Sequence, residues 1–590
     1  MRKPLAALSA ALVVIGTLSS AAPAEDFHHA TPVKHVIVIF NENISFDHYF
    51  ASYPYAQNGS GETRFQASRG TPIANNLVTP LNPNRFFSPL EGVNLLTKNP
   101  NGPTGSGATF NGLSATNPFR LAPSQAATAD QNHAPKPEQT AYDNGLMDQF
   151  PGSTGTAGPP PSATSTSEAA LSKGLTMGYF DGNTVTALWN YAQHFVLFDN
   201  TYTSQFGPST PGAINLISGQ TNGIGANTNV LSGSTLLHTS HEVFDNQGGL
   251  TLIGDAEPLG DVCSSTSSDN VQMTGKNIGD LLNTKGITWG WFQGGFDLQI
   301  MNANGSTGCM RSTPNIVAGY GGVAMNDYVE HHQPFQYYLS TANLTHARPS
   351  STWAIGHTYE QDGVTKDPAN HQYDTDDFFT ALSDGNLPAV SFLKPPSFQD
   401  AHPGNSDPID EQTFIVDTIN AVMHSPFWDS TAIFITYDDS DGWYDHQMPP
   451  IVDPSFSSLV DVLNAPSVCD SGVQQGRPAR TTPLNGVDGK PVWGRCGYGT
   501  RIPMLLISPL VDANVIDHTL TDQSSVIRFI EDNWLNGQRI QPGGSFDSIA
   551  GDVSHLFRDH AHEGDHGFGR DDDRRKLILN PSTGAVVDSH

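Results

Sequence analysis

The stretch Thr431-Ala-Ile-Phe-Ile-Thr-Tyr-Asp438-Asp439 joins an apolar run to two adjacent acids. A short run that is apolar at nearly every position is typical of a strand buried on both faces of a parallel sheet. Two neighbouring carboxylates repel each other unless a cation or a base compensates their charge. The stretch therefore predicts a buried strand whose carboxyl end carries a cation-binding pair.

Similar apolar runs recur along the chain, and helix-like segments lie between them. We expect buried strands at 36–40, 195–198, 287–292, 389–393, 432–437 and 502–507. We expect helices at 184–194, 410–424 and 522–534. Strands that alternate with helices predict an α/β fold with a doubly wound, largely parallel sheet. Segment 220–350 holds two of the four cysteines and many Gly and Asn residues, and we expect it to form an inserted cap.

Polar side chains follow three of these strands. Glu42 and Asn43 follow the first strand, Ser209 follows the strand at 195–198, and Asp438 and Asp439 follow the strand at 432–437. Ligands bind beyond the carboxyl ends of parallel strands. Oxygen donors suit Mg²⁺, Ca²⁺ or Mn²⁺, and carboxylates also bind Zn²⁺. A single acid at a strand end often only caps a helix, but the adjacent pair favours one divalent metal ion of unspecified identity.

Ser209 is the candidate nucleophile. It directly precedes Thr210-Pro211, and a proline in the first turn favours the start of a helix, here one that runs towards Ser218. Unpaired N–H groups and the positive end of the helix dipole readily hold phosphate there. A metal would help to ionise the hydroxyl, so Ser209 is predicted to form a phosphoserine. The alternative is a serine that only caps the helix.

Four histidines are candidates for contact with the phosphoryl oxygens: His133, the adjacent pair His331 and His332, and His402. Imidazoles can donate hydrogen bonds to phosphoryl oxygens and protonate a leaving alkoxide. The chain has 22 histidines, so spacing alone does not single these four out. If they act as cations, activity should be highest in mildly acidic solution, because an unperturbed histidine has a pKa of about 6.5.

The first 24 residues and the overall charge bear on location and partners. Residues 1–24 have a basic start, an apolar stretch and Ala22-Pro23-Ala24, the layout of a cleavable signal peptide, so we expect a secreted or periplasmic protein. We expect no later transmembrane segment, since no run of about 18 apolar residues follows. The net charge of −30 argues against nucleic acid as a partner, because phosphate backbones would be repelled.

The four cysteines form no close C-x-x-C pair of the kind found in zinc ribbons, so two disulfides are expected in an exported chain. Sequence order favours Cys263 with Cys309 and Cys469 with Cys496. Four cysteines allow three connectivities, and the sequence leaves all three open.

One motif makes the sequence similar to a known family. His35-Val-Ile-Val-Ile-Phe-Asn-Glu-Asn-Ile-Ser-Phe-Asp-His-Tyr-Phe50 closely resembles the opening motif of the bacterial phosphoesterases that include non-haemolytic phospholipases C and acid phosphatase A. Further family-like blocks follow in order: Asp148-Gln-Phe150, Gly207-Pro-Ser-Thr-Pro211, His402-Pro403, Tyr437-Asp-Asp-Ser-Asp-Gly-Trp-Tyr-Asp-His446, Gly497-Tyr-Gly-Thr-Arg-Ile-Pro503 and Ser508-Pro509. The resemblance extends over about residues 31–580, the expected catalytic domain, and leaves 581–590 as a tail.

The resemblance implies an alkaline-phosphatase-like α/β core and one metal ion. The residues matching the family's metal ligands are Glu42, Asn43, Ser209, Asp438 and Asp439. By the same resemblance Ser209 is the nucleophile, and His133, His331, His332 and His402 contact the phosphoryl oxygens. Family phospholipases C usually show Asp-Glu and then Gly-Gly where this chain has Asp438-Asp-Ser-Asp-Gly442, and commonly Thr in place of Ser209. Both departures favour the acid phosphatase branch.

The resulting prediction is an exported acid phosphatase that hydrolyses small phosphate monoesters through a phosphoserine. The first alternative is a phospholipase C that cleaves phosphodiester lipids at their head groups. The second is a non-catalytic exported protein that only binds metal. The sequence does not determine the oligomeric state.

Overall fold

The computed structural model describes residues 29–81, 90–101, 116–156, 173–227, 231–232, 235–236, 241–314, 324–470, 481–557 and 575–589. The expected signal peptide, residues 1–24, lies outside these ranges, as does residue 590 of the expected tail.

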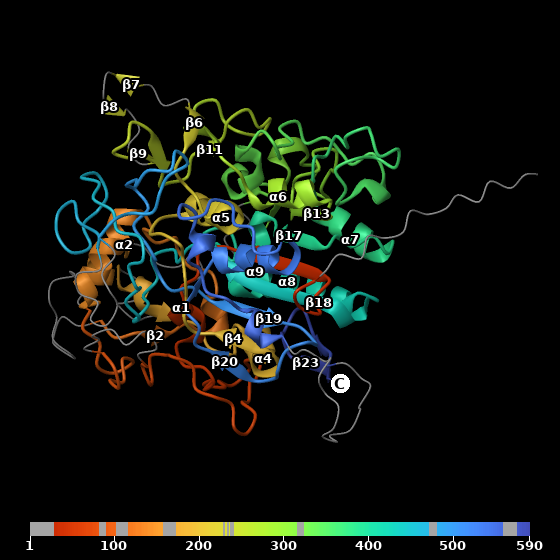
Figure 1. Ribbon diagram of the computed structural model, residues 1–590. Coiled ribbons are helices and arrows are strands. Elements are labelled where there is room, and N and C mark those ends of the chain that lie inside the picture. The colour runs from red at the N-terminus through yellow and green to blue at the C-terminus, as the bar shows by residue number, and fades with distance from the viewer. Residues whose placement is uncertain are drawn as a thin grey trace, which may run out of the picture.

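An eight-stranded sheet forms the centre of the molecule (Figure 1). Its strands, in spatial order, are β16 (Gln372–Tyr373), β13 (Trp289–Gln293), β17 (Val390–Lys394), β1 (His35–Asn41), β18 (Thr431–Tyr437), β19 (Met504–Ile507), β4 (Val196–Phe198) and β20 (Val515–Asp517). Of these eight, β19 runs antiparallel to both neighbours, and every other pairing is parallel. The predicted α/β fold with a largely parallel sheet is confirmed.

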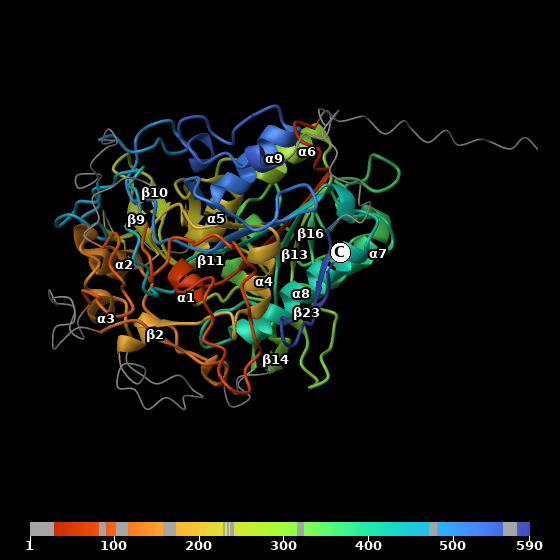
Figure 2. The same ribbon diagram turned by 90° about the horizontal axis from the view of Figure 1, so that it is seen from below.

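Helices cover both faces of this sheet. The α-helices in the described part of the chain are α1 (Phe46–Phe50), α2 (Pro135–Tyr142), α3 (Phe150–Ser153), α4 (Thr186–His194), α5 (Ser209–Ser218), α6 (Ile278–Lys285), α7 (Thr375–Ser383), α8 (Pro408–His424) and α9 (Ser524–Trp534). Alternate side chains of β18 show the two layers, since successive residues of a strand point to opposite faces. Phe434 packs against Phe529 of α9, while the Tyr437 hydroxyl donates to Glu411 of α8. Figure 2 shows α5, α6 and α9 on one side of the sheet and α4 and α8 on the other.

Local sequence signals begin and end these helices. The Asp407 carboxylate caps α8 by accepting from the N–H groups of Ile409 and Asp410, with Pro408 as the first helical residue. Helix α5 ends at Gly219, whose φ of 58° is a left-handed conformation that glycine adopts without strain. Local sequence signals thus define where α8 begins and where α5 ends.

All six predicted strands belong to the central sheet, and the four predicted helices, including the one that runs towards Ser218, correspond to α4, α5, α8 and α9. The sequence analysis missed β16 and β20, which lie at the two edges. It also gave no indication that β19 reverses direction. An apolar run records burial on both faces but carries no information about strand direction.

The segment expected to form a cap, 220–350, contributes both to the central layers and to small surface sheets. Strand β13 and helix α6 belong to the core, whereas the other strands form small separate sheets. These strands are β6 (Ile224–Asn227), β7 (Leu231–Ser232), β8 (Thr235–Leu236), β9 (Glu242–Phe244), β10 (Leu250–Leu252), β11 (Glu257–Pro258), β12 (Asn270–Met273), β14 (Ser312–Pro314) and β15 (Ala324–Asn326). Of these, β6, β7, β8, β9 and β11 lie towards the top of Figure 1. Its extent as a cap stays a prediction.

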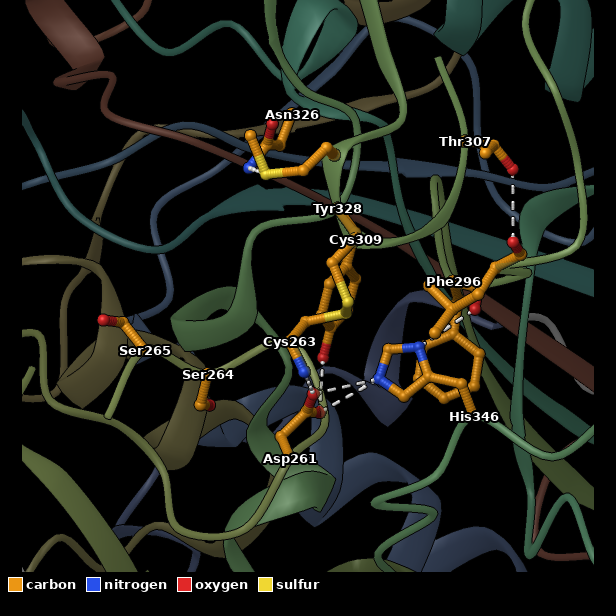
Figure 3. The surroundings of a disulfide bond; sticks show 12 residues. Asp261, Cys263, Ser264, Ser265, Phe296, Thr307, Cys309, Asn326, Tyr328 and His346 are labelled. Atoms are coloured by element: carbon orange, nitrogen blue, oxygen red, sulfur yellow. Dashed lines mark hydrogen bonds and ion pairs between the residues drawn. A yellow bond between two sulfur atoms is a disulfide. The ribbon is translucent and has the colours of Figure 1, made fainter. Parts of the chain in front are cut away.

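Two disulfides join Cys263 to Cys309 and Cys469 to Cys496, the pairing that sequence order favours. Figure 3 shows the first beside Asp261, a buried carboxylate that accepts hydrogen bonds from Tyr328 and His346. This network anchors the loop around Cys309 to the segment that follows β11.

The remaining small strands tie peripheral segments to the core. They are β2 (Phe119–Arg120), β3 (Gly178–Tyr179), β5 (Thr201–Tyr202), β21 (Thr521–Asp522), β22 (Leu577–Leu579) and β23 (Val586–Ser589). Asn420 of α8 donates to the carbonyl of Leu579, which fixes the β22–β23 hairpin against that helix. Within the described ranges, none of the helices combines the length and hydropathy needed to cross a bilayer.

Candidate active site

Ser209 is the first residue of α5, and its hydroxyl lies among three acidic or amide side chains. Its Oγ is 2.8 Å from Glu42 Oε2, 3.2 Å from Asp439 Oδ2 and 3.4 Å from Asn43 Oδ1. The side chain is almost completely buried. A hydroxyl has one proton and can donate to only one of these acceptors. The other two oxygens therefore lie around Ser209 Oγ without its proton, an arrangement that a cation would stabilise.

Two adjacent strands bring these oxygens together. Strands β1 and β18 pair in parallel with Asn41 opposite Tyr437, so the residues that follow each strand lie side by side. Asn43 has a φ of 62°, a left-handed conformation that asparagine tolerates better than most residues. Its N–H donates to Asp438 Oδ1 at 2.9 Å. The turn after β1 is thus fixed against the acidic pair.

The site holds more buried negative charge than its fixed positive charge can balance. Glu42, Asp438 and Asp439 are each at most 1% exposed. Burial, together with the charge of Asp438, raises the pKa of both Glu42 and Asp439 well above their ordinary values. Burial alone would also raise the pKa of Asp438, but its hydrogen bond with Glu42 and the charge of Lys394 lower it. Lys394 pairs with Glu42 and supplies one positive charge against three acids.

These residues fit a divalent metal ion. Asp438 Oδ2 is buried and has no hydrogen-bond partner, although a buried carboxylate oxygen without one is costly. The donors are all oxygens, which hard divalent cations prefer. A cation between Glu42, Asn43, Ser209 and the acidic pair would use the orphaned oxygen and offset the excess charge.

His332 approaches the site from the 3₁₀ turn Glu330–His332. Its Nδ1 lies 3.1 Å from Glu42 Oε1 and 3.9 Å from Asp400 Oδ2. The rings of His331 and His402 lie 4.4 and 6.4 Å from the His332 ring, centroid to centroid. Burial lowers the pKa of both His331 and His332. His332 Nε2 is buried with no hydrogen-bond partner, so it is available to a ligand.

His133 reaches the site from the segment before α2. Its Nδ1 is 3.3 Å from Asp441 Oδ1, and Asp441 in turn accepts from the Asn43 amide at 3.1 Å. Burial would lower the pKa of His133, but Asp439 and Asp441 raise it well above its ordinary value. His133 also lines an open pocket of about 400 Å³ together with Pro208. The structure thus brings every predicted site residue into one region, and the role of each stays a prediction.

Four residues of this region were missed by the sequence analysis: Lys394, Asp400, Asp441 and Glu138. Lys394 and Asp400 follow the predicted strand 389–393, so a charged residue at a strand end could have revealed them. Glu138 carries no such signal, yet its carboxylate accepts from Ser440 Oγ at 2.6 Å and from the Gly207 N–H at 3.0 Å. It connects the loop before Ser209 with the loop after Asp439.

Comparisons with known proteins identify the family of the chain. A model of the Phosphoesterase family matches residues 33–535. Non-hemolytic phospholipase C of Pseudomonas aeruginosa is 28% identical over 177 residues, which are 29% of this chain and 23% of that protein. Phospholipase C B of Mycobacterium tuberculosis is 28% identical over 157 residues, 26% of each chain. The chain thus spans about a quarter of the length of these curated relatives.

Two similar solved structures superpose on this chain with low TM-scores. A protein of the alkaline phosphatase superfamily from Vibrio parahaemolyticus shares 13% identity over 67% of each chain, with a TM-score of 0.24. Murine ectonucleotide pyrophosphatase/phosphodiesterase 5 shares 12% identity over 63% of this chain and 95% of that chain, with a TM-score of 0.27. The α/β assignment therefore rests on the sheet order and its helical layers.

Proposed function

Because the chain belongs to the Phosphoesterase family, we propose that it is an exported hydrolase of phosphate monoesters that uses Ser209 as its nucleophile. The observation that carries this proposal is the position of Ser209 Oγ, within 3.4 Å of side-chain oxygens of Glu42, Asn43 and Asp439 at the start of a helix. Two disulfides support export, since disulfides persist in oxidising compartments. The acid phosphatase branch is part of the proposal.

The residues of the site have distinct tasks in this reaction. A divalent cation held by Glu42, Asn43, Ser209, Asp438 and Asp439 would polarise the phosphoryl group and lower the pKa of the serine hydroxyl. Ser209 Oγ attacks phosphorus as the P–O bond to the ester alcohol breaks, and the alcohol leaves with the proton that Ser209 gives up. Water then cleaves the phosphoserine to inorganic phosphate and free Ser209. At the start of α5 the N–H of Thr210 already donates to Asp255 Oδ1 at 2.9 Å, and Pro211 has no N–H, so the cation and the histidines would hold the phosphoryl oxygens. Lys394 holds Glu42 in place through their ion pair.

His332 supports a preference for a singly protonated phosphate. Its Nδ1 faces Glu42, so in the neutral ring Nδ1 carries the proton and Nε2 is an acceptor. A phosphate monoester loses its second proton with a pKa of about 6, so in mildly acidic solution it carries one P–O–H group. That group can donate to the unpartnered Nε2. His133, His331 and His402 would donate to the remaining oxygens.

Cleavage of phosphodiester lipids is the second candidate, because the curated relatives named above are phospholipases C. Hydrolysis of an aryl phosphate and of phosphatidylcholine by the same preparation distinguishes the two activities. A larger kcat/KM for the aryl phosphate supports the proposal, and a larger value for the lipid replaces it by the second candidate.

Replacement of Ser209 by Ala tests the nucleophile and also the third alternative, metal binding without catalysis. We expect hydrolysis to fall by at least about a thousandfold, whereas binding of Mn²⁺ measured by calorimetry persists. Ser218→Ala, at the other end of α5, is the matched control and should keep its activity. Hydrolysis by Ser209→Ala at the wild-type rate would refute the assigned role. Absence of hydrolysis by the wild type with any common divalent metal would refute the proposal that the protein is an enzyme.

A further inference from the structure

A second pocket of about 340 Å³ lies at the carboxyl edge of the sheet. It starts where β13 and β17 end, at Gly294 and Pro396, and it is bounded by residues of α7 and α8. These two helices cover the face opposite α5, as the contacts of Phe292 with Phe378 of α7 and of Tyr437 with Glu411 of α8 indicate. The pocket is therefore separate from the cluster around Ser209.

Phenylalanines form much of the pocket wall. Phe379 of α7, Phe414 of α8 and Phe398 from the segment after β17 all line it. The face of an aromatic ring carries partial negative charge and attracts cations, and the ring also offers apolar contact area. Such walls favour a ligand with an apolar body and a positive charge.

The charged residues that line the pocket are mostly acids. Arg311 is the one basic residue among them, and it is already engaged: its Nη2 lies 2.8 Å from Asp374, and its Nε lies 3.5 Å from Asp327. Asp376 and Asp417 form no ion pair and no side-chain hydrogen bond within the residues that the structure describes. Both carboxylates are exposed, so the pocket presents two acids with which no described basic side chain forms an ion pair.

Asp327 has one buried carboxylate oxygen that accepts no hydrogen bond. It is 5% exposed, and its Oδ2 accepts from Asn302 and Thr313 at 2.8 and 3.2 Å. Its Oδ1 is buried without a hydrogen-bond partner. A buried carboxylate oxygen in this state is costly unless a ligand or water satisfies it. This second observation, independent of the charge count, also indicates a ligand.

We propose that this pocket binds an organic monocation, an alkylated or methylated ammonium group. A small inorganic cation would need several oxygens converging on one point, whereas here the acids lie among three aromatic side chains. An alkylammonium ion instead matches both features, because its carbon atoms contact the phenylalanines while its charge faces Asp376 and Asp417. This site is additional to the proposed phosphoesterase site and does not depend on it.

Trimethylammonium is a suitable probe, because it keeps one N–H that can donate to Asp327, and tert-butanol is its neutral counterpart of similar shape. Binding to the whole protein is measured by saturation-transfer NMR titration. We expect Asp376→Asn/Asp417→Asn to bind trimethylammonium about tenfold more weakly than the wild type, a difference of about 1.4 kcal/mol. Asp362→Asn/Asp384→Asn makes the same charge change at exposed acids outside the pocket and should bind like the wild type.

Phe398→Leu provides a second test that leaves every charge in place, and it should also weaken binding of trimethylammonium. Unchanged affinity in both pocket variants would overturn the proposal. Equal loss in the control variant would show that affinity follows net charge alone. Equal affinity for tert-butanol would indicate an apolar cavity, and displacement by equimolar Mg²⁺ would indicate an inorganic cation site. Each of the last three results also contradicts the proposal.

Discussion

Replacement of Lys394 by Met removes the positive charge beside Glu42 while keeping a side chain of similar length. Both members of this ion pair are 1% exposed, so the carboxylate would stay buried without its fixed cation. Removing one partner of a buried pair costs about 3–5 kcal/mol. We therefore expect the free energy of unfolding to fall by about that amount in a chelator. A divalent cation supplies positive charge at the same carboxylates, so the cost should be smaller with excess Mn²⁺.

Urea unfolding followed by tryptophan fluorescence measures this effect, since Trp289 and Trp291 are buried in β13 of the same sheet. Lys490→Met is the matched control, because Lys490 pairs with Asp488 at the surface. An exposed pair contributes little to stability, so this variant should unfold at the wild-type urea concentration. Equal effects of the two substitutions, or an equal cost with and without Mn²⁺, would refute the charge balance inferred for the site.

Three further substitutions test other parts of the structure. In Gly212→Ala the new Cβ would lie 2.1 Å from the carbonyl oxygen of Asp438, so unfolding measurements should show a loss of about 1–3 kcal/mol together with slower hydrolysis; unchanged stability would contradict this close approach of α5 to the acidic pair. Burial raises the pKa of Glu411 to about 7 from 4.5, so the stability it contributes when protonated is lost as pH rises through 7. As pH rises from 4.5 to 7.5, the free energy of unfolding of Glu411→Gln, measured in urea, should therefore increase by up to about 3 kcal/mol relative to that of the wild type. A constant difference in unfolding free energy between the two proteins over that range would disprove the pKa shift. Replacing both Cys469 and Cys496 by Ala removes a disulfide between residues 27 apart in the sequence. The free energy of unfolding measured in urea should therefore fall by about 3.5 kcal/mol, and an unchanged value would show that the disulfide does not restrict the unfolded chain.

The core could be predicted because burial leaves a clear pattern in the sequence. Strands β1 and β18 are apolar at almost every position and lie in the middle of the sheet, where both faces are covered. The edge strands gave no such pattern, since β16 has two residues and β20 is only half-buried. The reversal of β19 depends on how the chain returns to the sheet, which no local pattern records.

The candidate site was predictable where acids follow strands and where the family motif names residues. Lys394 was missed because lysines are usually exposed, so a single lysine in a sequence is expected at the surface. In the structure it is buried beside Glu42. Glu138 was missed because its contacts with Gly207 and Ser440 join residues far apart in the chain. Such long-range contacts follow from the folded arrangement and are not visible in local spacing.

The contact between the turn after β1 and the end of β18 has a consequence for synthesis. The hydrogen bond from Asn43 to Asp438 joins residues that are 395 positions apart. A chain emerging from the ribosome therefore exposes Glu42 and Asn43 long before their partners exist. No fragment that stops short of Asp439 can contain the complete site, so catalytic turnover reports that synthesis has passed that residue and that the two distant segments have folded together.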